Sequence, residues 1–255
     1  GKSDIWYKKI GLSYNLKAKN ELNNKQPIIL NNGLKEGSEI VELDFIDFNT
    51  FVKNSRNGIN HSIPITLPSF KVLKHFNITP TANYSESWYN KKLSYNRIDS
   101  LNRFAEIEEK GFNRTYKYNG SVKLNTRLYG YLNLSKNGLQ RLKHTITPSI
   151  SYNYSPNFGA DNFDSKFYET LVDTSGKELQ KSRFNGFVYG GPSNVEQQTV
   201  RFSLDNMIEG KYKSKNDTTD KATYFKMLDN IGFSTAYNFA ADSLNLAPLA
   251  MQGRV

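Results

Sequence analysis

Apolar and polar residues alternate along much of this chain with a period of two. In the stretch 10–18, Ile10, Leu12, Tyr14 and Leu16 are separated by small or polar residues. Successive side chains of a β-strand point to opposite faces, so this pattern predicts strands with one apolar and one polar face. It predicts about eight antiparallel strands, near residues 10–18, 59–67, 76–88, 112–134, 142–155, 198–213, 228–241 and 249–255.

Several of these stretches are longer than the roughly 5–6 residues that are usual for strands of soluble proteins. A strand that crosses a membrane needs roughly 9–11 residues. The polar positions are mostly Ser, Thr, Asn and Gly, which suits a wet surface better than a dry core. We therefore expect an all-β fold that forms a section of a larger antiparallel transmembrane β-barrel. A soluble sheet with one wet face, as in a β-sandwich binding module, remains the alternative.

The alternation assigns individual side chains to the two faces of the barrel wall. The apolar positions are expected to face lipid and the polar positions the lumen. In the two strands near 198–213 and 228–241, the residues expected to face lipid are Phe202, Leu204, Phe233 and Tyr237. Those expected to face inward are Arg201, Ser203, Ser234 and Asn238.

The links between the predicted strands differ in length, and this predicts an orientation. Links 89–111 and 156–197 are long, whereas 68–75 and 135–141 are short. Bacterial barrels combine long extracellular loops with short periplasmic turns, which places the long links outside. The segment 20–57 has apolar residues of its own and leaves room for one more pair of elements.

One of the long links contains an apolar cluster. Phe184, Phe187, Val188 and Tyr189 precede Gly190-Gly191-Pro192 within the otherwise polar 156–197. Long loops that pack on themselves are often functional lids. We expect Phe184 to Tyr189 to fold back as a cap or a short hairpin over the barrel mouth.

The composition excludes several kinds of site but does not select one function. The 255 residues carry 34 Lys and Arg against 24 Asp and Glu, and contain no Cys and only three His. Disulfides and thiolate or His-built metal sites are therefore not expected. The first residues are Gly1-Lys2-Ser3, and we interpret the whole of 1–255 as an internal fragment of one outer-membrane barrel domain.

The search for chemistry predicts neither an enzyme nor a cofactor. The carboxylates of Glu106, Glu108 and Glu109 form a run without the paired geometry that acid–base catalysis needs. Basic side chains alternate with the aromatic ones rather than sharing a face with them, so nucleic-acid binding is not expected.

A series of short motifs from about residue 58 onward resembles a known family. They are Gly58, His61-Ser62-Ile63-Pro64, Phe76-Asn77, Asn83-Tyr84, Glu86, Trp88-Tyr89, His144, Thr147-Pro148-Ser149, Gly190-Gly191-Pro192, Ser203-Leu204, Leu228-Asp229-Asn230, Tyr237-Asn238 and Ala241-Asp242-Ser243-Leu244. In order and spacing they resemble the LPS-assembly protein family LptD, in a diverged form. Another large outer-membrane barrel, such as a TonB-dependent receptor or a secretion channel, remains the alternative.

The resemblance implies a location, a cargo and partners. It implies a barrel in the outer membrane of a Gram-negative bacterium that inserts lipopolysaccharide (LPS) into the outer leaflet. It also implies an LptE-like lipoprotein plug, and a periplasmic bridge protein that delivers LPS to a jelly-roll domain absent from this fragment. The family's disulfide maturation does not carry over, because the chain has no Cys.

Because the cargo implied by the resemblance is an anionic glycolipid, basic side chains at the inward-facing positions are candidate contacts for it. Lys123, Arg127 and Arg201 are predicted to lie mid-strand, facing the lumen, where they would contact the cargo. A lumen lined with cations attracts phosphate groups, and weak multipoint contacts let the cargo move on. The alternative is that the basic side chains neutralise lipid headgroups or lumenal acids such as Asp205 and Glu209.

Overall fold

The computed structural model of the chain describes residues 6–21, 25–29, 35–40, 55–98, 103–136, 138–160, 163, 166–212 and 223–254. The main sheet contains β1 (Gly11–Leu12), β2 (Asn15–Glu21), β5 (Arg56–Thr66), β6 (Phe70–Val72), β7 (Phe76–Ile98), β8 (Arg103–Asn125), β9 (Leu128–Lys136), β10 (Leu139–Ser155), β13 (Gln197–Tyr212), β14 (Thr223–Asn238) and β15 (Ala250–Arg254). Outside it lie the hairpin of β3 (Lys25–Ile29) and β4 (Lys35–Ile40), the hairpin of β11 (Tyr168–Val172) and β12 (Glu178–Ser182), and the 3-10 turn η1 (Trp6–Lys9). In this described part of the chain, no helix has the length and apolarity needed to cross a membrane.

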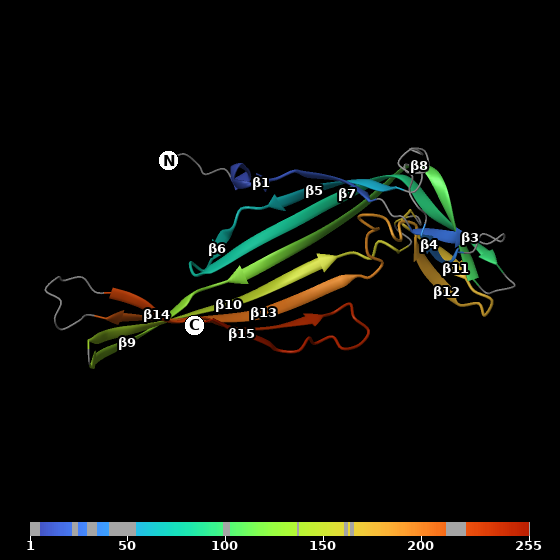
Figure 1. Cartoon of the computed structure of the whole chain (residues 1–255). Coiled ribbons are helices and arrows are strands. Elements are labelled where there is room, and N and C mark those ends of the chain that lie inside the picture. The colour runs from blue at the N-terminus through green and yellow to red at the C-terminus, as the bar shows by residue number, and fades with distance from the viewer. Residues whose placement is uncertain are drawn as a thin grey trace.

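The main sheet is one antiparallel meander. Its order is β1–β5–β7–β8–β10–β13–β14–β15, with β2 beside β5, β6 beside β7 and β9 beside β10. Figure 1 shows the long strands side by side, with β11 and β12 near one end of the sheet and β9 extending from the other. The order does not return to its first strand, so the sheet is open. The all-β antiparallel prediction is confirmed, and an open sheet of this kind fits a section of a larger barrel.

The strands overlap the expected stretches, but one expected loop is wrong. Residues 89–111 were expected to form a long link, whereas β7 and β8 pair from Lys91↔Lys110 to Ile98↔Arg103. The hairpin of β3 and β4 lies within the segment 20–57, while residues 41–54 are outside the described part of the chain. Link 68–75 contains the short strand β6.

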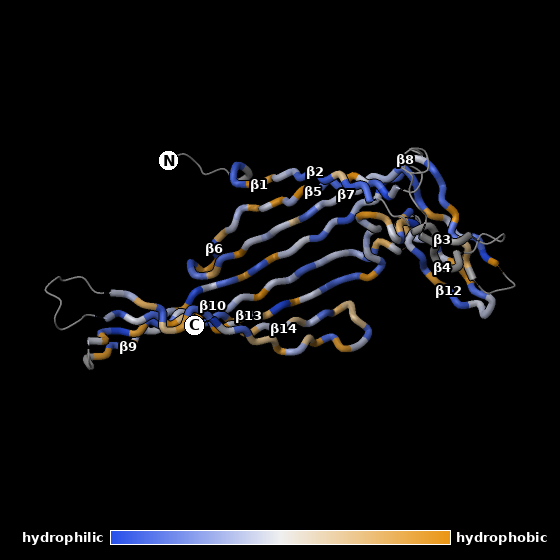
Figure 2. Tube along the Cα trace, in the orientation of Figure 1, coloured by the Kyte–Doolittle hydropathy of each residue, from blue (hydrophilic) through white to orange (hydrophobic). Residues whose placement is uncertain are grey.

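The register sorts the side chains into two faces. One row across the sheet is Ile78, Leu124, Ile150, Phe202 and Thr235, and the next row is Thr79, Lys123, Ser151, Arg201 and Ala236. We call the first the apolar face and the second the polar face. Figure 2 shows hydrophilic and hydrophobic positions alternating along the long strands. Leu204 pairs with Phe233 and Ser203 with Ser234, which confirms the predicted sharing of faces.

The buried core lies at one end of the sheet. Among the described residues, the buried hydrophobic side chains are Tyr89, Leu93, Tyr95, Ala105, Phe158, Phe163, Phe167, Leu171 and Phe184. The middle of the apolar face is uncovered: Phe202 is 47% exposed and Met251 is 67% exposed. In the described part of the chain no second sheet packs on this face, which is unlike a β-sandwich.

A proline explains the break between β8 and β9. Thr126 and Arg127 lie in the break, and the Thr126 N–H donates to the carbonyl of Pro148 on β10 at 3.3 Å. In an antiparallel ladder the N–H and C=O of one residue point to the same neighbour. Pro148 has no N–H to return, so the ladder is interrupted at this point.

Candidate functional site

The polar face consists of rows of small hydroxyl and amide side chains. Cross-strand hydroxyls bond one another, with 2.6 Å between the oxygens of Thr81 and Ser121 and 2.7 Å between those of Ser149 and Ser203. Asn60 adds an amide donor to the hydroxyl of Ser85 at 3.0 Å. These side chains satisfy one another locally and leave a wettable surface. Such a face is suited to line a water-filled space rather than to pack in a core.

Two of the three predicted cations lie in one row of the polar face. Lys123 on β8 and Arg201 on β13 both pair with Ser151 on β10, one from each side. They are therefore two strand spacings apart, about 10 Å. Both are exposed, and within the described residues neither has an ion-pair partner. The register thus brings together two free positive charges that are 78 positions apart in the sequence.

The third predicted cation is placed differently. Arg127 was expected mid-strand, but it lies in the break between β8 and β9. The cause is Pro148, which interrupts the ladder opposite Thr126. Lys143, another base with inward parity, forms an ion pair with Glu209 at 2.9 Å. Lys143 therefore neutralises an acid on the same face, which was the alternative to a contact with the cargo.

The two faces of β7 exchange their character in the middle of the strand. Up to Trp88, the positions on the polar face are Asn77, Thr79, Thr81, Asn83, Ser85 and Ser87. From Tyr89 onward the same face carries Leu93 and Tyr95, which are both buried. The other face changes in the opposite sense, from Tyr84 and Trp88 to Asn90. The apolar positions of β7 therefore move from one face to the other at Trp88 and Tyr89.

We call residues 156–196 the capping segment, and described residues of this segment cover the inverted part of β7. The ring of Tyr89 lies 5.3 Å from that of Phe184 and 5.1 Å from that of Phe187, measured between ring centroids. The backbone N–H of Leu93 donates to the carbonyl of Arg183 at 2.7 Å. The predicted folding back of Phe184 to Tyr189 is confirmed.

Tyrosine hydroxyls fix the capping segment to the sheet. Tyr89 donates to the carbonyl of Gly190 at 2.9 Å and Tyr95 to that of Ser182 at 2.7 Å. From the segment itself, Tyr189 donates to the carbonyl of Lys17 on β2 at 3.0 Å. Burial raises the pKa of Tyr95 to about 12, so its hydroxyl stays a protonated donor even at alkaline pH where an exposed tyrosine ionises. These bonds join the segment to β2 and β7, which are not neighbours in the sheet.

Gly58 on β5 permits the close approach of this segment. A Cβ atom at Gly58 would lie 2.8 Å from a ring carbon of Tyr89 and 2.8 Å from a methyl of Val188. Only a residue without a side chain leaves room for both, because real Cβ contacts are longer. The glycine therefore allows the capping segment to lie directly on the sheet.

Sequence reasoning missed the extension of β7 for a physical reason. The apolar parity changes at Trp88 and Tyr89, so the strand no longer matches one continuous period-two pattern. The missed signal was a new alternation, Tyr89, Leu93 and Tyr95, on the opposite parity. The predicted carboxylate run is structural in part, since Glu108 pairs with Lys91 at 2.9 Å and Glu109 with Lys92 at 3.2 Å.

The described residues contain no group of three or more His, Asp or Glu side chains that could hold a metal ion.

The family model described as LptD protein matches residues 1–255 of the chain. No curated protein and no solved structure matches it.

Proposed function

The chain belongs to the LptD family, and on this premise we propose that its sheet is a section of an outer-membrane barrel wall that conducts LPS. The polar face lines the lumen and the apolar face contacts lipid. The protein works by binding and guiding its cargo, without covalent chemistry.

The inversion of β7 is the observation that carries this proposal. Between Phe76 and Trp88, the apolar side chains of β7 lie on the uncovered face, where the lipid of a membrane would surround them. Beyond Trp88 the uncovered face of β7 carries Asn90, Lys92, Ser94 and Asn96, whereas Leu93 and Tyr95 lie under the capping segment.

Lys123 and Arg201 form the row of the lumen wall that contacts the cargo. LPS carries phosphate groups, and two cations about 10 Å apart attract them without enclosing them. The hydroxyl of Ser151 lies between the two cations and offers a neutral hydrogen bond. Weak contacts at several points hold an anion briefly and release it, as transport requires.

The open edges of the sheet support a larger barrel and further partners. Among the described strands, β2 at one edge and β15 at the other each have one unpaired side, and a membrane does not tolerate lipid-exposed unpaired backbone. We propose that other strands of the same wall pair with them. An LptE-like lipoprotein then occupies part of the lumen, and a periplasmic jelly-roll domain receives LPS from the bridge protein.

We place the end that carries the capping segment at the outer leaflet. The capping segment lies at this end, and the hairpin of β3 and β4 lies near it in Figure 1. Long loops are extracellular in bacterial barrels. A protease added to intact cells that express the full-length protein should cut in the exposed turn at Lys177. Cleavage only after the periplasm is opened would reverse the orientation.

Charge reversal tests the role of the lumen. In the full-length protein, Lys123→Glu combined with Arg201→Glu should slow the appearance of new LPS at the cell surface, while the barrel still assembles. Lys74→Glu with Lys177→Glu changes the net charge equally in exposed turns and serves as the control. Normal assembly with unchanged delivery in the lumen variant would remove the cations from the mechanism.

A further inference from the structure

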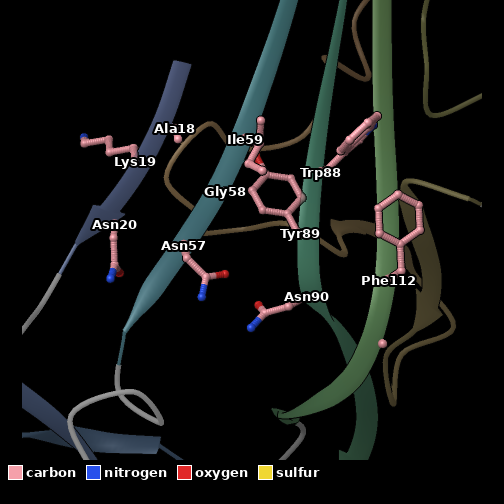
Figure 3. Close-up of a pocket in the computed structure, with 11 residues that line it drawn as sticks. Ala18, Lys19, Asn20, Asn57, Gly58, Ile59, Trp88, Tyr89, Asn90 and Phe112 are labelled. Atoms are coloured by element: carbon pink, nitrogen blue, oxygen red, sulfur yellow. The ribbon is translucent and has the colours of Figure 1, made fainter. Parts of the chain in front are cut away.

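A pocket opens between strands β2, β5, β7 and β8 near the capping segment. It has a volume of ≈ 680 Å³ and lies where β5 and β7 separate beyond their last pair, Ile59↔Trp88. Its size falls within the range of ordinary ligand sites. Figure 3 shows that Asn20, Asn57 and Asn90 project from three strands into one region, with the rings of Trp88 and Phe112 to one side.

The three asparagines continue the apolar face beyond its last apolar row. Asn20 pairs with Asn57, one row above Ala18 and Ile59, and Asn90 follows Trp88 with the same parity. Within the described part of the chain their side-chain amides have no hydrogen-bond partner in the protein. They therefore offer donors and acceptors at the level where the wall changes from apolar to polar.

A bulge in β8 brings an aromatic ring to the same place. The pairing with β7 shifts between Tyr89 and Lys91, which leaves Gly111 and Phe112 opposite the single residue Asn90. Gly111 has a φ of 152°, a conformation that favours glycine. Phe112 is 73% exposed and its ring lies 5.7 Å from that of Trp88, edge to face.

A network of polar groups holds the row below in place. The carboxylate of Glu86 accepts hydrogen bonds from Trp88 Nε1 and from the hydroxyl of Tyr84, both at 2.5 Å. The Nε of Arg114 lies 3.7 Å from the same carboxylate, and the side chain of Arg114 is 54% exposed. The indole is thereby fixed, and the guanidinium remains accessible beside it.

We propose that this pocket binds the phosphorylated sugar headgroup of an LPS molecule resident in the surrounding outer leaflet. Exposed aromatic rings beside free amides suit a sugar, because rings pack on its C–H faces and amides bond its hydroxyls. Arg114 suits a phosphate. The acyl chains of the same molecule lie on the apolar rows beyond Glu86, among them the row of Ile63, Tyr84 and Tyr118. The site differs from the cargo path, which runs on the opposite face.

The proposal rests on the proposed orientation, since only the outer leaflet contains LPS. Its test is photo-crosslinking from the full-length protein in native outer membranes. A photoreactive amino acid replaces Phe112 or, as the control at the other end of the same face, Leu128, which is 54% exposed. We expect LPS adducts from position 112 and none from position 128.

Amide removal then tests the pocket itself. With the crosslinker at position 112, Asn57→Ala combined with Asn90→Ala should lower the LPS adduct roughly tenfold, as loss of two hydrogen bonds implies. Asn119→Ala on the polar face is the matched control and should leave the adduct unchanged. An absent adduct, or one that the double variant does not lower, overturns the site and leaves the transport proposal standing. Adducts with phospholipid alone overturn the site. If Lys177 is also protected from protease on intact cells, the proposed orientation is overturned as well.

Discussion

The two halves of β7 stabilise apolar side chains in different ways. Between Phe76 and Trp88 the apolar positions lie on an uncovered face, whereas Leu93 and Tyr95 in the second half are buried under the capping segment. The same strand therefore faces two media, lipid and protein. The apolar character of a side chain does not by itself show whether lipid or protein surrounds it. The face on which the side chain lies, and whether other residues cover that face, show this. The expected effects of substitution differ accordingly.

The largest effect is expected under the capping segment. Phe167 is 1% exposed and packs edge to face on Tyr116, with ring centroids 5.0 Å apart. Phe167→Ala should lower the free energy of opening this segment by about 3–5 kcal/mol, because a cavity remains. Native-state proteolysis of the reconstituted full-length protein measures this opening. Phe202→Ala on the apolar face should have a much smaller effect, since lipid chains fill the space. Equal effects would mean that protein also covers Phe202.

An intermediate effect is expected on the apolar face. Phe233→Arg places a charge in the middle of the lipid-facing wall and should cost about 2–4 kcal/mol of folding free energy in bilayers. Ser234→Arg points the same charge into the lumen and should cost far less. Reversible urea unfolding in liposomes gives both values. If the two variants are destabilised equally, the faces are not assigned to lipid and lumen as proposed.

The smallest effect is expected for a single hydrogen bond of the capping segment. Tyr95→Phe removes the donor to the carbonyl of Ser182 and should cost about 0.5–1.5 kcal/mol. Tyr152→Phe, on the exposed apolar face, is the control and should be neutral. The same proteolysis assay applies, with the cut expected near Lys177. No change in Tyr95→Phe would show that the segment is held by ring packing alone.

Much of the wall follows from local sequence, and the functional site only in part. The parity of Arg201 and Ser203 against Phe202 and Leu204 was readable, because strand geometry fixes alternate directions. The shared row of Lys123 and Arg201 was not, since it depends on the register of three strands. The break in the ladder at Thr126 and Arg127 required knowing that Pro148 lies opposite Thr126.

The sequence by itself determined most of the strands, their two faces and the presence of an apolar cluster from Phe184 to Tyr189. It did so because these depend on residues that are close along the chain. Only the tertiary structure decided that β7 continues past Trp88 and that its faces exchange there. It also decided that Asn20, Asn57 and Asn90 form one side of a pocket. These features depend on what covers each face and on which strands lie beside one another, and alternation along a single strand carries no information about either.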